Sequence, residues 1–511
     1  MIKMSAHAAT ILSPHAPRVA AAWGPTSYAA VAPYAPARAY PELPFARPNP
    51  ATPVNSAYDS VRECFRLLGM DDANFETHRW NPLGGVIQPG DTVLLKPNLV
   101  REFRETHAGH DDCVITHGSL IRAVADYVFR ALDGRGRIVI ADAPHSDCDF
   151  DSVVRIAGLR EIQEAYRREI GFPIELYDLR PEHAHKIDGV IVGHRQLPGD
   201  PAGYAKVDLA EGSMFCEIED LCRNLYGSEY DRGELFSHHR DGRHEYLISR
   251  SVLTADVVIS LPKLKTHKKT GITVNMKNLV GINGNKNWLP HHREGTPAQG
   301  GDQFADEGAG SHLEGSVVRG FRRVFPYLGP LRPVVAGPIK ALGKRVFGDT
   351  NTVRIRSGNW HGNDTTWRMV IDLNRALHYS DGGGRLHEQP MRRFFSIVDG
   401  IVGGEGNGPM DPTARPAGLV LAGHNPVAVD LAAARLIGFD WRKLAVLGRA
   451  LAPHTMPLVN FAMVHLASNQ AEYSGALNDL TGPGLGFRPH FGWAGHVELD
   501  GGRLREAGVV A

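Results

Sequence analysis

The chain has 511 residues, of which 56 are Lys or Arg and 56 are Asp or Glu, so its formal net charge is zero. This balance argues against a protein that coats nucleic acid, and a content of 42% hydrophobic and 22% charged residues argues against a disordered chain. No run of about 18 apolar residues indicates a membrane-spanning helix. We therefore expect a globular protein without a nucleic-acid partner.

Short runs rich in Val and Ile recur along the chain and predict strands. They are Arg18–Trp23, Thr92–Lys96, Arg137–Ala141, Ile174–Tyr177, Asp256–Leu261, Phe394–Val398 and Gly418–Ala422. Apolar residues at helical spacing predict helices over Ser119–Leu132, Leu159–Glu169 and Ala428–Ile437. Strands that are apolar throughout are buried on both faces, so this alternation predicts an α/β fold, a mainly parallel sheet with helices on both faces.

Changes in composition divide the chain into a disordered tail (1–17), an α/β core in two parts (18–294 and 357–455), a loop and basic helical insertion between them (295–356), and a C-terminal extension (456–511). Within the insertion, residues 316–348 contain seven Lys or Arg residues, separated by apolar residues, and no acidic residue. This pattern is typical of a surface helical insertion, or of amphipathic helices that make a peripheral contact with an anionic membrane.

The five cysteines form no CxxC pair, which predicts a reducing compartment and no iron–sulfur cluster. The first residues lack the charged and apolar regions of a signal peptide, so we expect a cytoplasmic location.

Polar side chains follow four of the predicted strands. They are Lys96 and Asn98, then Asp142, then Lys263, Lys265 and His267, and finally Asp399. In an open α/β sheet, ligands bind outside the carboxyl ends of the strands. Each residue could simply end a strand in solvent, but four such endings favour a common site.

The segment Pro262–Asn278 contains five lysines and one histidine without an acidic residue. Thr266 and Asn278 add neutral hydrogen-bonding groups, and the apolar residues between them indicate a partly buried structure. We interpret this segment as an anion pocket in which Lys277 takes part, although a charged surface loop is the alternative.

Two further segments carry charged side chains. Asp399 and Glu405 flank glycines that run into Pro409 rather than into a helix, which excludes a dinucleotide-binding motif and favours a flexible loop. Its carboxylates could bind a divalent metal or act as acid and base. A helix with Asp364 as N-cap is predicted further along. There Arg368, with Asp372 and Arg375 on the same face, forms either a salt-bridge ladder or part of the anion site.

Several of these segments together resemble the DUF362 family. The matching motifs are KPN (96–98), ADVVISLPKLKTH (255–267), KTGITVNMKNLVGI (269–282), LPHHREG (289–295), SGNWHGNDTTWRMVIDLNR (357–375), IVDGIVGGEGNGP (397–409) and HNPVAVDLAAARLIGFD (424–440). The resemblance implies an α/β domain of poorly defined activity. Many members carry added ferredoxin segments, whose cysteines this chain lacks. Members of this form are similar to proteins encoded among polysaccharide-biosynthesis genes.

We weigh three functions. The first is an enzyme that acts on an anionic small molecule, such as a phosphorylated or nucleotide-linked sugar. In it, Lys96, Lys263, Lys265 and Lys277 hold the anion, Asp142, Asp399 and Glu405 bind a metal or move protons, and His267 is a general acid/base. The second is a non-catalytic module that binds a lipid-linked or polymeric glycan at the membrane. The third is a redox or metal-cluster scaffold. The reaction, the substrate and the oligomeric state remain open at this point.

Overall fold

The structure, a computed structural model, describes residues 10–48, 54–102, 111–187, 190–227, 229, 231–306 and 355–500. The predicted basic segment 316–348 lies outside these residues.

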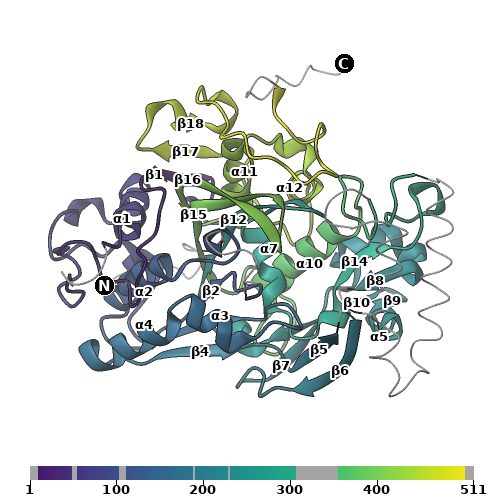
Figure 1. The fold of residues 1–511 in the computed structure, drawn as a ribbon, viewed down its shortest axis with the longest axis horizontal. Helices are drawn as coiled ribbons and strands as arrows, with labels where there is room; N and C mark the ends of the chain where they lie inside the picture. The colour runs from purple at the N-terminus through teal and green to yellow at the C-terminus, as the bar shows by residue number, and fades with distance from the viewer. Residues whose placement is uncertain are drawn as a thin grey trace.

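A large mixed sheet organises the molecule (Figure 1). Its strand order is β18 (Gly475–Ala476), β17 (His465–Ser468), β1 (Arg18–Trp23), β16 (Asp411–Gly423), β15 (Arg393–Asn407), β11 (Val257–Leu261), β2 (Thr92–Pro97), β3 (Arg137–Asp142) and β4 (Ile174–Asp178). Strands β15, β11, β2, β3 and β4 run parallel to one another, whereas β16 runs antiparallel to both β1 and β15. The prediction of a mainly parallel α/β sheet is therefore confirmed, and all seven predicted strands belong to it.

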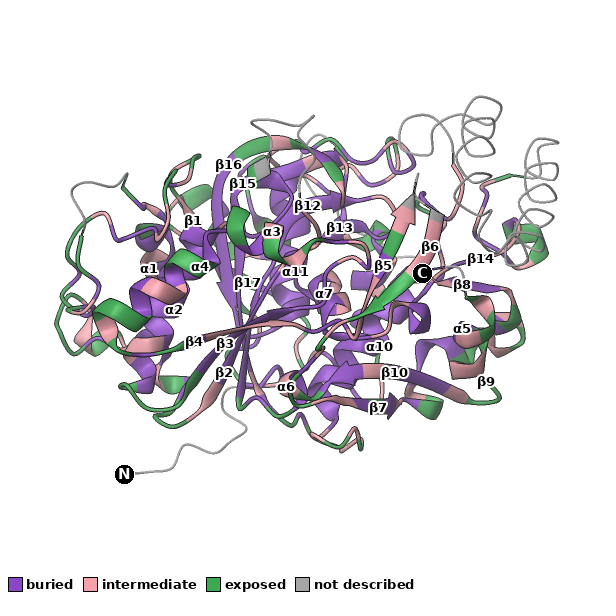
Figure 2. Ribbon diagram, turned by 60° about the horizontal axis from the view of Figure 1, so that its bottom comes forward, coloured by how far each residue is buried: buried purple, intermediate pink, exposed green. Residues whose placement is uncertain are grey.

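Helices cover both faces of this sheet because its strands are apolar on both sides (Figure 2). Val93 and Leu95 of β2 pack into one core, whereas Leu94 between them packs into the other. The first core is covered by α1 (Ala57–Leu67), α2 (Gly118–Leu132), α3 (Phe150–Ile156) and α4 (Leu159–Ala165). The second is covered by α6 (Arg250–Leu253), α7 (Asn275–Asn278), α10 (Thr366–Tyr379), α11 (Pro426–Ile437) and α12 (Ala445–Ala450).

Small strands beside the main sheet were not predicted. They are β5 (Glu182–Ile187) with β6 (Val190–Gln196), β7 (Tyr204–Asp208) with β10 (Arg243–Ser249) and β9 (His239–Arg240), and β8 (Leu225–Gly227) with β14 (Pro290–Arg293). The helix α5 (Arg232–His238) and the 3-10 segment η8 (Met214–Asn224) lie among them. The strands β12 (Lys263–His267) and β13 (Gly271–Thr273) form a hairpin, and β12 joins the main sheet beside β15.

The glycine-rich stretch predicted as a flexible loop is strand, because β15 continues to Asn407 and pairs with β16 along its length. The glycines serve close packing rather than flexibility. A Cβ at Gly400 would lie 2.6 Å from the Leu419 carbonyl oxygen, and one at Gly404 would lie 2.9 Å from that of Cys113. A side chain at either position would therefore push the neighbouring backbone away.

Both predicted terminal segments contribute to the folded core. Ile11 of the expected tail is fully buried, and its carbonyl oxygen accepts a hydrogen bond from Asn425. The extension supplies β17 and β18 at one edge of the sheet. Among the described residues, no helix is both long and apolar enough to cross a membrane.

Candidate anion-binding site

A cavity of about 400 Å³ opens beside the carboxyl ends of β2 and β3. Its wall is strongly basic among the described residues. The basic and acidic lining side chains are six lysines (Lys96, Lys186, Lys268, Lys269, Lys277, Lys286), four histidines (His145, His267, His291, His292) and two carboxylates (Asp142, Glu229). The carboxyl ends of parallel strands thus form the candidate site, as the topology predicts.

Lys96 and Asp142 form a buried ion pair between neighbouring strands, with Nζ 2.6 Å from Oδ1. Lys96 also donates to the Pro97 carbonyl oxygen, and Asp142 accepts from the Leu99 amide. Burial lowers the pKa of Lys96, whereas the adjacent Asp142 opposes that shift. With its partners fixed in this way, Lys96 links β2 to β3 and is less available to a ligand than the sequence suggested.

Gly281 packs directly against this ion pair, since a Cβ there would lie 2.0 Å from Asp142 Oδ1 and 2.7 Å from Lys96 Nζ. We expect Gly281→Ala to lower the free energy of unfolding by about 1–3 kcal/mol, the usual effect of overpacking. Urea unfolding measures this change. Gly85→Ala is the matched control, because nothing lies within 4 Å of its added Cβ. Equal stability of the two variants would contradict the close packing at Gly281.

Three lysines of the cavity present ammonium groups that a bound anion could contact. Lys277 has no hydrogen-bond or ion-pair partner among the described residues, and burial lowers its pKa to about 8. Lys269 donates to carbonyl oxygens of His291 and Ser357, and Lys286 to those of Ala143 and Asn283. Burial lowers the pKa of both Lys269 and Lys286 to about 7. Carbonyl oxygens only partly compensate a buried positive charge, and an anion would compensate it better.

His267 lines the cavity in a single tautomer. Its Nδ1 accepts hydrogen bonds from the backbone amides of Lys269 and Thr270, so its proton must lie on Nε2. Burial, with the lysines around it, holds the pKa of His267 well below its ordinary value. His267 is therefore suited to donate a hydrogen bond to a ligand, and not to the general acid/base role that the sequence suggested.

Two histidines missed in the sequence are better placed to take up a proton. His145 Nδ1 hydrogen-bonds to the Asp147 carboxylate, and His291 Nδ1 lies 2.8 Å from the Leu289 carbonyl oxygen. Each contact places the ring proton on Nδ1. The Nε2 atom then carries no proton, and its lone pair can accept one. Burial lowers the pKa of both rings and keeps them neutral. A carboxylate that orients a neutral imidazole is the usual support for a general base.

Lys263 and Asp399 lie outside the cavity lining and pair with each other. Lys263 Nζ lies 2.9 Å from Asp399 Oδ2, and both side chains are fully buried. The Tyr28 hydroxyl and the His117 amide also donate to the Asp399 carboxylate. Because these donors already occupy both of its oxygens, we assign Asp399 a structural role in place of the predicted catalytic and metal-binding ones.

Lys265 and Thr266 also turn away from the cavity. Lys265 Nζ donates to the carbonyl oxygens of Val114 and Pro409 and to Asn98 Oδ1 at 2.6, 3.2 and 3.3 Å. Thr266 donates to the Gly406 carbonyl oxygen at 3.0 Å. These groups join β12 to its neighbours, so the expected contact of Lys265 and Thr266 with an anion is not supported.

Glu405 and Arg368 do not line the cavity. Glu405 is six residues from Asp399 along β15, a separation of about 20 Å in a strand, and it pairs with Arg488. The two carboxylates cannot share a metal. Arg368 pairs with Glu217 and Asp364.

The helix that carries Arg368 also differs from its prediction. The expected N-cap Asp364 does not cap it, because Asn363 Oδ1 accepts hydrogen bonds from the Thr365 amide and from the Thr366 amide, at the first residue of the helix. Asp372 accepts from Ser213 and Met214, and Arg375 donates to Gly212. The face of α10 that carries Arg368, Asp372 and Arg375 is therefore buried against η8. It forms neither a row of surface salt bridges nor part of the cavity.

Six of the predicted site residues do line the cavity, namely Lys96, Asn98, Asp142, His267, Lys277 and Asn278. Asn278 positions the wall rather than a ligand, because its amide donates to the Lys96 carbonyl oxygen and to Ser260.

A group of potential cation ligands borders the cavity. Glu182, His194 and Glu229 place one ligand atom each within 4.8 Å of the others. Glu229 is 6% exposed, and its Oε1 has no hydrogen-bond partner among the described residues. Burial raises the pKa of Glu182, and the nearby Glu229 carboxylate adds to that shift. These three residues fit a divalent cation better than Asp399 and Glu405 do.

The fold and the site together define a mainly parallel α/β protein with a basic cavity at the carboxyl ends of its strands. A family model described as a domain of unknown function, DUF362, matches residues 93–201 and 214–435, more than half of the chain. The chain belongs to the DUF362 family.

Two further comparisons add little to this assignment. A search of curated proteins gave no match. Among solved structures, the chain is similar to a Thermotoga maritima protein determined by the Northeast Structural Genomics Consortium, with 12% identity and a TM-score of 0.31. The match covers 74% of this chain and 58% of that protein, so the chain spans less than two thirds of it.

Proposed function

We propose that the protein is an enzyme that acts on an anionic small molecule, such as a phosphorylated or nucleotide-linked sugar, bound in the lysine-lined cavity. The observation that carries the proposal is the charge of the cavity wall, where six lysines face two carboxylates and one of those carboxylates is already paired with Lys96. Lys269 is buried, and Lys277 and Lys286 are half-buried. Ammonium groups withdrawn from water in this way are unfavourable without a counter-charge, and a phosphate group supplies one.

The arrangement suggests a role for each group. Lys269, Lys277 and Lys286 hold the anionic group, and His267 donates a hydrogen bond to it through Nε2. His145, oriented by Asp147, takes up a proton from the bound substrate at its Nε2. A divalent cation at Glu182 and Glu229 would bring positive charge to the same wall.

Thermal unfolding with added ligands tests the binding step. We expect phosphate, pyrophosphate and nucleotide-linked sugars to raise the melting temperature at low salt, because a ligand that binds only the folded state stabilises it. Neutral sugars are the control and should have no effect. Parallel samples with Mg²⁺ or Mn²⁺ test the cation. If no phosphate compound stabilises the protein under these conditions, the proposed function is wrong.

Ligand binding should also take up protons near pH 8. In the empty cavity the pKa of Lys277 is about 8 and those of Lys269 and Lys286 are about 7, so these groups are partly or largely neutral at pH 8. A bound anion favours their charged forms and raises these pKa values. Affinity for pyrophosphate should therefore fall as the pH rises above 8. Calorimetry in two buffers of different ionisation enthalpy measures the uptake, expected to be about one proton or more. Binding without proton uptake would contradict this account.

A further inference from the structure

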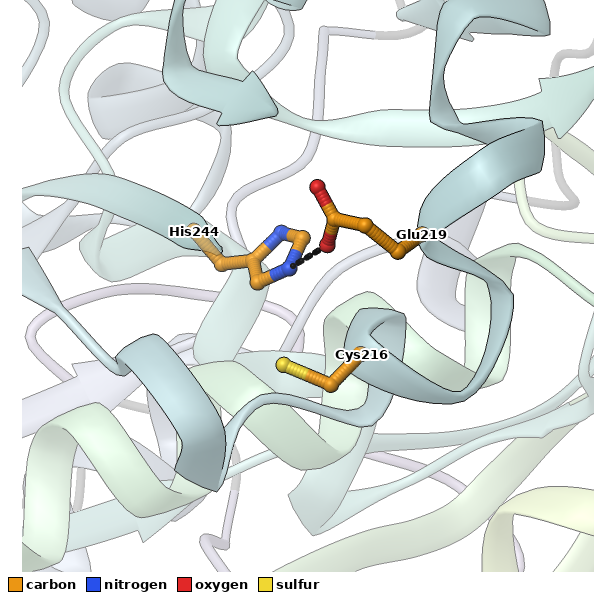
Figure 3. A group of neighbouring side chains, drawn as sticks. All are labelled: Cys216, Glu219 and His244. Carbon is orange, nitrogen blue, oxygen red and sulfur yellow. Dashed lines mark hydrogen bonds and ion pairs between the residues drawn. The ribbon is translucent and has the colours of Figure 1, made fainter. Parts of the chain in front are cut away.

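A second cluster of potential metal ligands lies apart from the cavity (Figure 3). Cys216 and Glu219 come from η8, and His244 comes from β10. The sulfur, one carboxylate oxygen and one ring nitrogen lie within 4.8 Å of one another. His244 Nε2 is 2.9 Å from Glu219 Oε2. None of the three residues lines the basic cavity.

Neighbouring groups hold these side chains in place. The Gly242 amide donates to the other oxygen of Glu219, at 3.2 Å. Asp208 accepts from the backbone amides of both His244 and Ala210, and the Ala210 carbonyl oxygen contacts the Cys216 sulfur at 3.1 Å. Ligands fixed in this way need little reorganisation to close around an ion.

The local charge also favours a cation. A thiolate and a carboxylate together would balance the two charges of one divalent ion.

We propose that Cys216, Glu219 and His244 form a Zn²⁺ site whose remaining coordination position is open to solvent. Thiolate, imidazole and carboxylate are the protein ligands that Zn²⁺ combines, whereas Mg²⁺ and Ca²⁺ prefer oxygen alone. Bond lengths of about 2.3 Å to sulfur and about 2.0 Å to nitrogen or oxygen place the ligands of one zinc ion about 3.5 Å apart. The three atoms here lie within 4.8 Å of one another, so they would move closer together when the ion binds.

Zinc binding displaces two protons, one from Cys216 and one from Nε2 of His244. The Cys216 thiol releases its proton to solvent when sulfur binds the ion. The imidazole proton moves from Nε2 of His244 to Nδ1, a buried nitrogen that has no hydrogen-bond partner among the described residues.

Zinc titration of the purified, chelator-treated full chain tests the site. We expect tight binding of one Zn²⁺ at these residues, and Co²⁺ in its place should show the near-ultraviolet absorption of a thiolate ligand. Cys216→Ser should abolish that absorption and weaken binding by at least about 10-fold, since even substitutions outside the ligand set have effects of that size. Glu182→Gln alters the separate group of potential cation ligands that borders the cavity. As a control, this variant should leave the thiolate absorption unchanged. An unchanged absorption in Cys216→Ser would overturn the proposal.

Alkylation gives a second readout that requires no variant. Cys216 is exposed, whereas Cys64, Cys113, Cys148 and Cys222 are buried. Iodoacetamide should therefore modify Cys216 first in the folded protein. Zn²⁺ at about 10 times its dissociation constant should slow that modification about 10-fold, because only the unliganded thiol reacts. Equal rates with and without saturating Zn²⁺ would show that Cys216 is not a ligand. Neither experiment depends on the proposed enzyme activity.

Discussion

Replacing Lys277 by methionine is expected to weaken pyrophosphate binding by about 10- to 100-fold, the loss of one charge-assisted hydrogen bond from a half-buried side chain. The same change should leave the unliganded protein as stable as before, or more stable. Lys277 has no partner among the described residues and is held at a lowered pKa of about 8 by burial alone. An apolar side chain of similar length therefore removes a desolvation cost and breaks no contact. Calorimetric titration and thermal unfolding measure the two effects separately.

The pair of measurements distinguishes a binding residue from a structural one. Lys443→Met, at an exposed position, is the matched control and should change neither quantity. If Lys277 only supported the fold, its replacement would lower the melting temperature. Pyrophosphate binding would then decrease only in proportion to the fraction of protein that is unfolded. Unchanged affinity with unchanged stability would instead show that the anion binds away from Lys277.

Seven strands of the main sheet could be predicted, because a run of apolar residues identifies a buried strand without knowledge of its partner, whereas β12, β13, β17 and β18 of the same sheet were not predicted. The peripheral strands escaped prediction for the opposite reason. The segment Glu182–Ile187, for example, is mostly polar and obtains its strand structure from pairing with β6. Such pairing depends on tertiary contacts that a short polar segment does not encode by itself.

The candidate site shows a similar division. The position of Asp142 and Lys96 at strand ends was predictable, since parallel topology brings these ends together. The partner of each charge was not, because Lys263 finds Asp399 from far along the chain. His145 and Asp147 were overlooked because nothing in the sequence of this loop distinguishes them. Only the fold places His145 in the cavity wall, with Asp147 behind it as its hydrogen-bond partner.

Replacing Asp399 by asparagine should lower the free energy of unfolding by about 3–5 kcal/mol, because it leaves the Lys263 ammonium buried without its counter-charge. Both side chains are fully buried, and their charged atoms lie 2.9 Å apart. The large effect comes from the unpaired charge rather than from the lost contact. Denaturant unfolding followed by circular dichroism measures it.

The double variant Lys263→Met with Asp399→Asn tests that reason directly. Removing both charges should restore most of the lost stability, since replacing a buried ion pair by uncharged groups is often close to neutral. The sequence-based alternative, in which Asp399 is a catalytic or metal-binding group, predicts a different result. Asp399→Asn would then reduce activity or metal binding at unchanged stability, and Lys263→Met would rescue nothing. A stable Asp399→Asn variant would therefore return Asp399 to the list of candidate catalytic residues.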